Sequence, residues 1–380
     1  MAGPLRRRRD RRGDPGQHVR AGTGDGGGRR RRGRAVSSPW DRQARHAPGG
    51  LGRTLTVGTA TATRPVRVLV TGATGFLGRW VTEGFSALGD HVTTFSGRAL
   101  GAASTKTGRA LRRAAAEVDA VCHLAAATPL QLGRRDDLAY ARCNVDATHL
   151  LLDAVAATSG CRVVFASTAM VGGLSEAATR RQSDRVTYAE SKLVAEDLVE
   201  RYSGQAGSGV SLRFNALGGP RTPPDRGVVA AALRAAHEDR PFDLYGSGSS
   251  GRDYLHVLDA ARAVISAARR PVDGYQAIEI GSGQLSTTDA VLAAVEHATG
   301  RRVRRRHLPE RADVDERPAC DLRPARAMLD WTPHRSRLAT LVSDQWAEQQ
   351  EPGGFSARLR WALDTSGRPL TTIAPPRAGG

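Results

Sequence analysis

The chain has 380 residues, a formal net charge of +18 and four cysteines, and its length allows two to three domains. The charge is uneven, because the first 64 residues hold 16 arginines against 4 aspartates, with no lysine or glutamate. A uniformly basic, nucleic-acid-binding fold is therefore not indicated. The sequence has no apolar run of about 18 residues, which a membrane-spanning helix needs, and no apolar secretory segment near its start.

Residues 1–64 are predicted to form a disordered extension. Arginine runs at 6–9 and 29–32 stand among many glycines, with too few apolar side chains to bury a core. A nucleic-acid-binding arm is the alternative interpretation of the same charge.

The cysteines predict neither a metal site nor a disulfide framework. They lack the spacing of metal ligands, and most lie in stretches typical of core elements, which favours reduced, packed thiols in a cytoplasmic protein. The four residues are Cys122, Cys143, Cys161 and Cys320.

Residues 66–78 carry the pattern around which the rest of the chain is arranged. An apolar run at 66–70 predicts a buried strand, and a helical pattern follows from 76 to 88. A strand that turns sharply into a helix exposes backbone N–H groups that bind a phosphate. Gly72 would allow the tight turn, Gly75 the approach of a pyrophosphate, and Gly78 close packing of the helix on the strand. The stretch therefore predicts a dinucleotide site.

Strands and helices alternate over residues 65–215, which predicts a Rossmann-like, doubly wound α/β domain with a parallel sheet covered on both faces. The further strands are expected at 91–95, 120–124, 161–166 and 209–213, and the helices at 107–117, 138–157 and 187–202.

After Asn215 the pattern becomes less regular, which predicts a smaller, mixed α/β substrate lobe over residues 216–350. Residues 277–280 are expected to return as a strand to the first domain. Residues 351–380 are rich in glycine, proline and arginine and are predicted to form a flexible tail. Helices are expected at 227–238, 287–299, 324–329 and 338–348.

Two groups of residues point to catalysis. Tyr188 and Lys192 lie four residues apart in a helical pattern and so share one face. A neighbouring ammonium favours the phenolate, so we expect the pKa of Tyr188 to fall toward neutrality and the side chain to act as general acid or base on a hydroxyl. Ser167 and Thr168 end a predicted strand, where Thr168 could hydrogen-bond the reacting oxygen. Taken singly, each has a simpler interpretation: a surface Tyr–Lys pair and a capping hydroxyl.

Together with the glycine turn, these residues make the chain resemble the extended short-chain dehydrogenase/reductases. Within them it resembles the NAD-dependent epimerase/dehydratase family and its UDP-glucose 4-epimerases. The resemblance spans roughly residues 66–348. Its matching segments are 72–78, 123–126, 144–145, 167–168, 188–192, 213–215, 245–248, 252–257, 280–283 and 329–331.

The resemblance implies a nucleotide-sugar substrate and NAD or NADP as cofactor. Tyr188 would be the acid/base, Lys192 would also hold the nicotinamide ribose, and Thr168 would support the reacting hydroxyl. The implied cofactor contacts are Gly72, Thr74, Gly75, Phe76, Leu77, Gly78, Leu124, Ala125, Ala126 and Asn144. The implied substrate contacts are Ser167, Thr168 and, on the diphosphate, Asn215, Arg252 and Arg311. A solvated charge is the alternative for Arg311.

Several departures from the family pattern bear on specificity. The second strand ends at Ser96-Gly97-Arg98, without the NAD-selecting aspartate, so Arg98 could meet a 2′-phosphate and NADP remains an option. No strand is apparent between Arg98 and Val118, which predicts a trimmed sheet edge. Gly172 stands where the family usually has a tyrosine, which leaves the sugar open. The two residues after Thr168 are Ala and Met, not the Asp-Glu pair of the 4,6-dehydratases, which argues against dehydration.

The leading hypothesis is an NAD(P)-dependent nucleotide-sugar epimerase that oxidises the C4 hydroxyl, turns the 4-keto sugar over and returns the hydride to the other face. One alternative is an NADPH-dependent reductase of a keto-sugar or another small carbonyl. Another is a dinucleotide-binding sensor or RNA-associated protein. By the same resemblance, the helices at 138–157 and 187–202 would form a homodimer interface.

Overall fold

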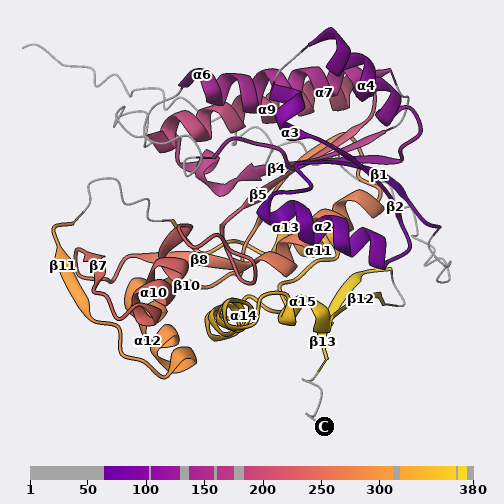
Figure 1. Cartoon of the computed structure of the whole chain (residues 1–380). Coiled ribbons are helices and arrows are strands. Elements are labelled where there is room, and N and C mark those ends of the chain that lie inside the picture. Colours follow the sequence, from indigo (N-terminus) through magenta and orange to yellow (C-terminus); the bar gives the residue numbers. More distant parts are fainter. Residues whose placement is uncertain are drawn as a thin grey trace, which may run out of the picture. The chain divides into compact units, whose positions relative to one another are not determined.

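The computed structural model describes residues 64–101, 104–128, 137–157, 161–174, 184–310, 317–364 and 367–374 (Figure 1). The predicted extension at 1–64 therefore lies outside the described residues except for Arg64, and so does Arg311.

A six-stranded parallel sheet forms the centre of the fold, with strand order β2-β1-β3-β4-β5-β9. The chain winds outward from β1 to β2 and then returns past β1 to β3, so the winding direction reverses between β1 and β3. Ligands of such sheets bind beyond the carboxyl ends of the strands at this reversal. The predicted doubly wound α/β class is confirmed. The strands are β1 (Arg67–Thr71), β2 (His91–Phe95), β3 (Ala120–His123), β4 (Arg162–Thr168), β5 (Ser208–Phe214) and β9 (Tyr275–Ile280).

The edge strand β2 is the last strand on its side among the described residues. This agrees with the trimmed edge expected from the short segment after Arg98.

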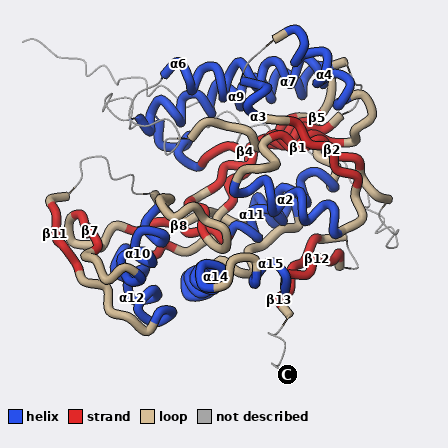
Figure 2. The backbone as a smooth tube through the Cα atoms, in the orientation of Figure 1, coloured by secondary structure: helices blue, strands red, loops and turns tan. Residues whose placement is uncertain are grey.

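Helices cover both faces of this sheet (Figures 1 and 2). Side chains alternate along β1, so Leu69 joins the hydrophobic cluster on one face while Val68 and Val70 join the cluster on the other. The first face carries α4 (Thr105–Ala115), α7 (Ala147–Ala156) and α9 (Asp184–Gln205), and the second carries α2 (Phe76–Ala87) and α11 (Val257–Arg269).

Helix α11 was not predicted, although it is the helix most deeply buried in the sheet's second face. Almost every one of its residues is buried. Its polar residues, among them Asp259, Arg262 and Ser266, recur at helical spacing, so the sequence did contain a signal for this helix. Arg262 and Asp259 form an ion pair of 3.0 Å inside this core. The other Asp259 oxygen accepts hydrogen bonds from the backbone of Arg335 and the hydroxyl of Ser336. The charges are thus compensated by residues far along the chain.

The second half of the chain adds a smaller lobe of short strands and helices. Its core combines α10 (Gly227–His237), α12 (Thr288–Thr299) and α14 (Leu338–Gln350). The strands β6 (Ala216–Gly218), β8 (Gly251–His256) and β10 (Leu285–Thr287) form a mixed sheet, and β7 (Phe242–Tyr245) pairs in parallel with β11 (Arg305–Leu308). Helix α13 (Arg323–Leu329) packs against β9.

The prediction of a flexible tail from residue 351 is wrong for residues 354–364 and 367–374. A short helix, α15 (Gly354–Arg358), leads into an antiparallel hairpin of β12 (Leu359–Leu363) and β13 (Pro369–Ile373). Phe355 is buried and its ring meets Trp80 of α2 edge-on. Long-range packing onto α2 therefore orders a segment whose composition favours disorder.

Shorter elements surround the site: α3 (Gly97–Gly101), α6 (Asp137–Tyr140), the π-helical segment η1 (Ala141–Asp146) and the 3₁₀ turn η2 (Ala169–Gly173).

In the described part of the chain, no helix is long and apolar enough to cross a membrane.

Candidate active site

The glycine turn between β1 and α2 is shaped by close backbone contacts. Gly72 has a φ of +72°, and a Cβ there would lie 2.6 Å from the backbone nitrogen of Ala125. Gly75 donates its N–H to the Gly72 carbonyl at 2.9 Å. A Cβ on Gly78 would lie 2.0 Å from that same carbonyl oxygen. Any side chain at Gly72 or Gly78 would therefore displace the turn.

The first turn of α2 faces this loop without a competing side chain. Its N-cap is Gly75, no side chain caps it, and its first turn contains no acidic residue. The N–H groups at this end stay available to an anion. Thr74 and Gly75 are exposed at the turn, whereas Leu77 is buried beneath it.

Arg98 lies exposed on α3, directly after β2. Its neighbour Gly97 approaches the loop after β3, where a Cβ would lie 2.9 Å from the Cβ of Ala125. The segment 124–126 therefore lies between the glycine turn and the end of β2.

A buried chain of hydrogen bonds fixes the ends of β1 and β3. The Thr71 hydroxyl contacts His123 Nδ1 at 2.7 Å, and His123 Nε2 contacts the Thr148 hydroxyl at 2.9 Å. Thr71 also accepts the backbone N–H of Ala125 at 3.3 Å. Burial lowers the pKa of His123 to about 3, with the nearby Lys192 as a second cause. The ring is therefore neutral at physiological pH.

Asn144 extends this network to the helix that carries Tyr188 and Lys192. Its side-chain oxygen accepts the Ala127 N–H at 2.8 Å, and its amide donates to the Ser191 hydroxyl at 2.9 Å. Ser191 in turn donates to the backbone carbonyl of Tyr188 at 2.7 Å. Asn144 lies in the π-helical segment η1, and such segments are frequent at functional sites. The asparagine therefore holds the loop after β3 and α9 in one arrangement.

Lys192 is buried against the sheet. Its Nζ lies 4.0 Å from the centre of the Phe165 ring on β4, and only 2% of the residue is exposed. Burial lowers the pKa of Lys192 to about 7, against a raising effect of Glu196. Lys192 is thus near half-protonation at neutral pH.

The expectation for Tyr188 is wrong in this structure. Burial raises the pKa of Tyr188 to about 12, and the cation that lowers it is Arg226, which the sequence did not single out. Tyr188 packs beside Tyr140, with ring centroids 5.9 Å apart. The cost of burying a phenolate exceeds the stabilisation by the neighbouring cation, so the phenol is neutral here.

A cavity of about 240 Å³ lies beyond the end of β4 and brings together three predicted residues: Thr168, Asn215 and Arg252. Asn215 donates to Glu279 at 2.7 Å. The Thr168 hydroxyl accepts the Met170 N–H at 3.3 Å. A hydroxyl, an amide and a guanidinium therefore share one space.

Ser167 does not line this cavity. Its hydroxyl is buried and has no hydrogen-bond partner among the described residues. The structure therefore does not support the substrate contact expected of this side chain.

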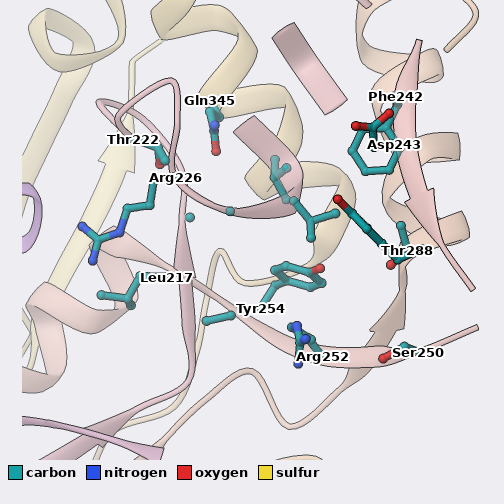
Figure 3. A pocket seen from close by; sticks show the side chains of 16 residues that line it. Leu217, Thr222, Arg226, Phe242, Asp243, Ser250, Arg252, Tyr254, Thr288 and Gln345 are labelled. Atoms are coloured by element: carbon teal, nitrogen blue, oxygen red, sulfur yellow. The ribbon is translucent and has the colours of Figure 1, made fainter. Parts of the chain in front are cut away.

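A second cavity of about 330 Å³ adjoins the first and shares Ala216 and Arg252 with it. Figure 3 shows Tyr254 within it, Arg226 on one side, and Phe242 and Asp243 on the other. The Arg226 guanidinium also lies 5.4 Å from the ring of Phe76, at the start of α2.

Three residues of the site were missed by the sequence reasoning. Arg226 and Arg317 belong to arginine-containing loops in which no single arginine stands out. Asp253 accepts backbone N–H groups of Ser282, Gly283 and Cys320, and so holds together the wall of the first cavity. The Arg-Asp-Tyr sequence at 252–254 was a usable signal for this aspartate.

Comparisons with known proteins agree with this geometry. The family model of the NAD dependent epimerase/dehydratase family matches residues 68–281. The chain belongs to this family.

Family members of known activity resemble the chain over most of its length. A UDP-glucose 4-epimerase of Streptomyces lividans is 27% identical over 328 residues, which are 77% of this chain and 99% of the relative. The structure of MoeE5 with UDP-glucuronic acid and NAD has a TM-score of 0.62 at 27% identity, covering 75% of this chain and 99% of that one. The NAD complex of the UDP-glucose 4-epimerase of Thermus thermophilus has a TM-score of 0.62 at 26% identity, with the same coverage.

Proposed function

We propose that the chain is an NAD(P)-dependent nucleotide-sugar 4-epimerase that works through a 4-keto intermediate. One observation carries the proposal: Lys192 lies over Phe165 of β4, and Thr168 ends the same strand beside a cavity that contains Arg252. Relatives with 4-epimerase activity support the choice of reaction. Ala169 and Met170, which follow Thr168, carry no group that transfers protons and so give no support to dehydration.

The residues around the glycine turn fit a dinucleotide. A pyrophosphate would lie against the uncapped start of α2, where Gly72 and Gly78 leave the backbone accessible. The loop 124–126 and Asn144 would border the nicotinamide half, and Lys192 would hold its ribose. When bound, the cofactor would take up the hydride from C4 and supply it again to the opposite face of the sugar.

The chain's own residues would position the sugar and move its proton. Thr168 would hydrogen-bond the C4 oxygen, and Tyr188 would accept the hydroxyl proton and later return it. Because the pKa of Tyr188 is raised to about 12 by burial, this role needs a cation to stabilise the phenolate, and Arg226 is the cation that lowers this pKa. Asn215 and Arg252 would hold the diphosphate, since a guanidinium matches phosphate oxygens.

Mass spectrometry of small molecules released from the denatured, full-length protein tests the proposal, together with NMR of the purified protein mixed with UDP-sugars. We expect close to one NAD per chain and the appearance of the C4 epimer without net consumption of cofactor. Tyr188→Phe should abolish the epimer while cofactor binding persists. Turnover that survives in this variant would contradict the assigned chemistry.

The exposed Arg98 supports one alternative, an NADPH-dependent reductase. The segment Ser96-Gly97-Arg98 contains no carboxylate to meet a ribose, and a guanidinium there suits a 2′-phosphate. Protein that is isolated without cofactor, and that consumes NADPH stoichiometrically with a keto-sugar, would favour this reaction over epimerisation.

We also propose that the protein is a homodimer through α6, α7 and α9. Leu138 of α6 is 69% exposed, and Val194 and Leu193 of α9 are 47% and 36% exposed, which is a surface that a second copy would cover. The Val194→Glu variant should be monomeric in sedimentation experiments, whereas a wild-type monomer would refute the interface.

Four free cysteines and a nucleotide cofactor fit an enzyme of the cytoplasm.

A further inference from the structure

Two arginines of the loop between β6 and α10 lie on one face of α2. Arg226 is the last residue before α10, and its guanidinium lies 5.4 Å from the centre of the Phe76 ring. Arg221 lies earlier in the loop, with its guanidinium 4.2 Å from the centre of the Trp80 ring. Phe76 and Trp80 are four residues apart and so share a face of the helix. The loop of the smaller lobe therefore packs on the helix that begins at the glycine turn.

The charge of Arg221 is compensated within the protein. Its guanidinium forms ion pairs with Glu83 of α2 at 2.5 Å and with Glu348 of α14 at 3.7 Å. Its φ of +62° lies in the left-handed region, which is uncommon for a residue with a side chain. These contacts hold the loop against α2 and thereby determine where the side chain of Arg226 begins.

Arg226 has no comparable partner. Among the described residues, its side chain forms neither an ion pair nor a hydrogen bond. Burial lowers the pKa of its guanidinium, against raising effects of Tyr188 and of the exposed Asp225. A guanidinium that the fold partly removes from water without a carboxylate partner is costly, and an anionic ligand would offset that cost.

The direction of this side chain favours an anion at the glycine turn. In Figure 3, Arg226 extends away from Phe242 and Asp243, which lie on the opposite side of the second cavity. Its guanidinium lies instead beside Phe76, the first residue of α2, whose N-terminus has no side-chain cap and no acidic residue in its first turn. The free N–H groups of this turn and the guanidinium therefore both supply positive potential at the start of α2.

We propose that Arg226 is a further cofactor-binding residue, contributed by the smaller lobe, which binds the pyrophosphate of the dinucleotide. A guanidinium matches phosphate oxygens with parallel hydrogen bonds, and the phosphate supplies the negative charge that Arg226 lacks in the protein. A guanidinium has more donors than one phosphate oxygen uses, so this contact is compatible with the effect of Arg226 on Tyr188. Because the same loop borders the second cavity through Thr222, a bound dinucleotide would also hold that wall of the cavity in place.

Calorimetric titration of the cofactor-free, full-length protein with NAD, ADP, UDP and adenosine tests this assignment. NAD and ADP share an adenosine diphosphate, UDP represents the diphosphate of a nucleotide sugar, and adenosine has no phosphate. In Arg226→Gln, we expect the affinity for NAD and ADP to fall by about 10-fold or more, with UDP and adenosine unchanged. Arg226→Lys should recover part of the loss, since it restores the charge without the planar fork.

Arg302→Gln provides the matched control, because Arg302 is an exposed cation of the same lobe whose side chain forms no ion pair with a described residue. It should leave all four affinities unchanged. Unchanged affinity for NAD in Arg226→Gln would overturn the inference. A loss for UDP as large as that for NAD would also overturn it, because it would assign Arg226 to the diphosphate of the nucleotide sugar.

Adenosine and the binding readout separate the remaining outcomes. A loss for adenosine equal to that for ADP would overturn the inference, because it would show that the variant damages the site without acting on a phosphate. Each arm of the experiment measures binding alone, so the result does not depend on which reaction the protein catalyses. Failure of the proposed epimerase function would therefore leave the test of Arg226 intact.

Discussion

Replacing Lys192 by methionine should stabilise the cofactor-free protein, and the gain should depend on pH. Burial lowers the pKa of Lys192 from 10.5 to about 7. Each unit of pKa shift corresponds to about 1.4 kcal/mol, so the shift corresponds to roughly 5 kcal/mol of unfavourable free energy in the folded state. Methionine has a similar length, keeps the contact with Phe165 and carries no charge. Lys192 therefore makes the cofactor-free protein less stable than a methionine at this position would, as is common for residues that serve a functional site.

The sign of the pH dependence follows from proton linkage. The folded-state pKa lies below the unfolded one, so the unfolded chain binds more protons between about pH 7 and 10.5. The destabilisation caused by the buried charge of Lys192 is complete below pH 7 and disappears as the pH rises from 7 to 10.5. The advantage of Lys192→Met should therefore be largest at pH 6 and shrink by about 1.4 kcal/mol per pH unit above pH 7.

Urea unfolding of the cofactor-free protein at pH 6, 8 and 10 measures this difference. Lys106→Met on α4 is the matched control, because Lys106 is exposed, and it should show no comparable trend. A Lys192→Met variant that is less stable than the wild type at pH 6, or whose advantage does not change with pH, would refute the reasoning.

Three further substitutions test the cofactor side of the site. Gly78→Ala places a Cβ 2.0 Å from the Gly72 carbonyl oxygen and should cost about 1–3 kcal/mol of unfolding free energy, with loss of bound dinucleotide by mass spectrometry. The matched control Gly204→Ala, whose Cβ meets nothing within 4 Å, should be neutral or stabilising; equal losses in the two variants would contradict the steric argument. Asn144→Ala removes hydrogen bonds to the loop after β3 and to α9 and should lower kcat/KM about 10-fold or more, and an unchanged value would show that the network does not position the site. Arg98→Asp should shift dinucleotide affinity from NADP toward NAD by about 10-fold in calorimetry, and unchanged preference would exclude a 2′-phosphate contact.

The first half of the fold could be predicted because its signals are local. In β1, β3 and β4 the apolar runs mark buried parallel strands, and the glycines of the turn at 72–78 have steric reasons that the structure displays. These features need no knowledge of contacts made at long distance.

The parts that could not be predicted depend on contacts between distant segments. Helix α11 has polar residues at helical spacing, but no local pattern indicates that a stripe containing Asp259 and Arg262 lies inside the core. Its internal charges are satisfied by Ser336 and by the backbone of Arg335, more than sixty residues away. Likewise the tail is ordered by Phe355 against Trp80. Neither the contacts of the α11 charges nor the contact of Phe355 with Trp80 can be recognised from a local sequence pattern.

The same limit applies to the candidate site. The i, i+4 spacing correctly placed Tyr188 and Lys192 on one helix, but the electrostatics of both side chains are set by burial. A spacing rule carries no information on how much water the fold removes from a phenol or an ammonium. The cation that acts on Tyr188 is Arg226, thirty-eight positions later in the chain.

The network around the site restricts which group responds to pH near neutrality. His123 connects Thr71 with Thr148, and burial lowers its pKa to about 3. The ring therefore stays neutral from pH 5 upward, and the hydrogen bonds that fix the ends of β1 and β3 do not change there. The pKa of Lys192 lies at about 7 and that of Tyr188 at about 12. Between pH 6 and 8, Lys192 is thus the member of this group whose charge changes, which makes it the group through which pH would act on the reacting centre.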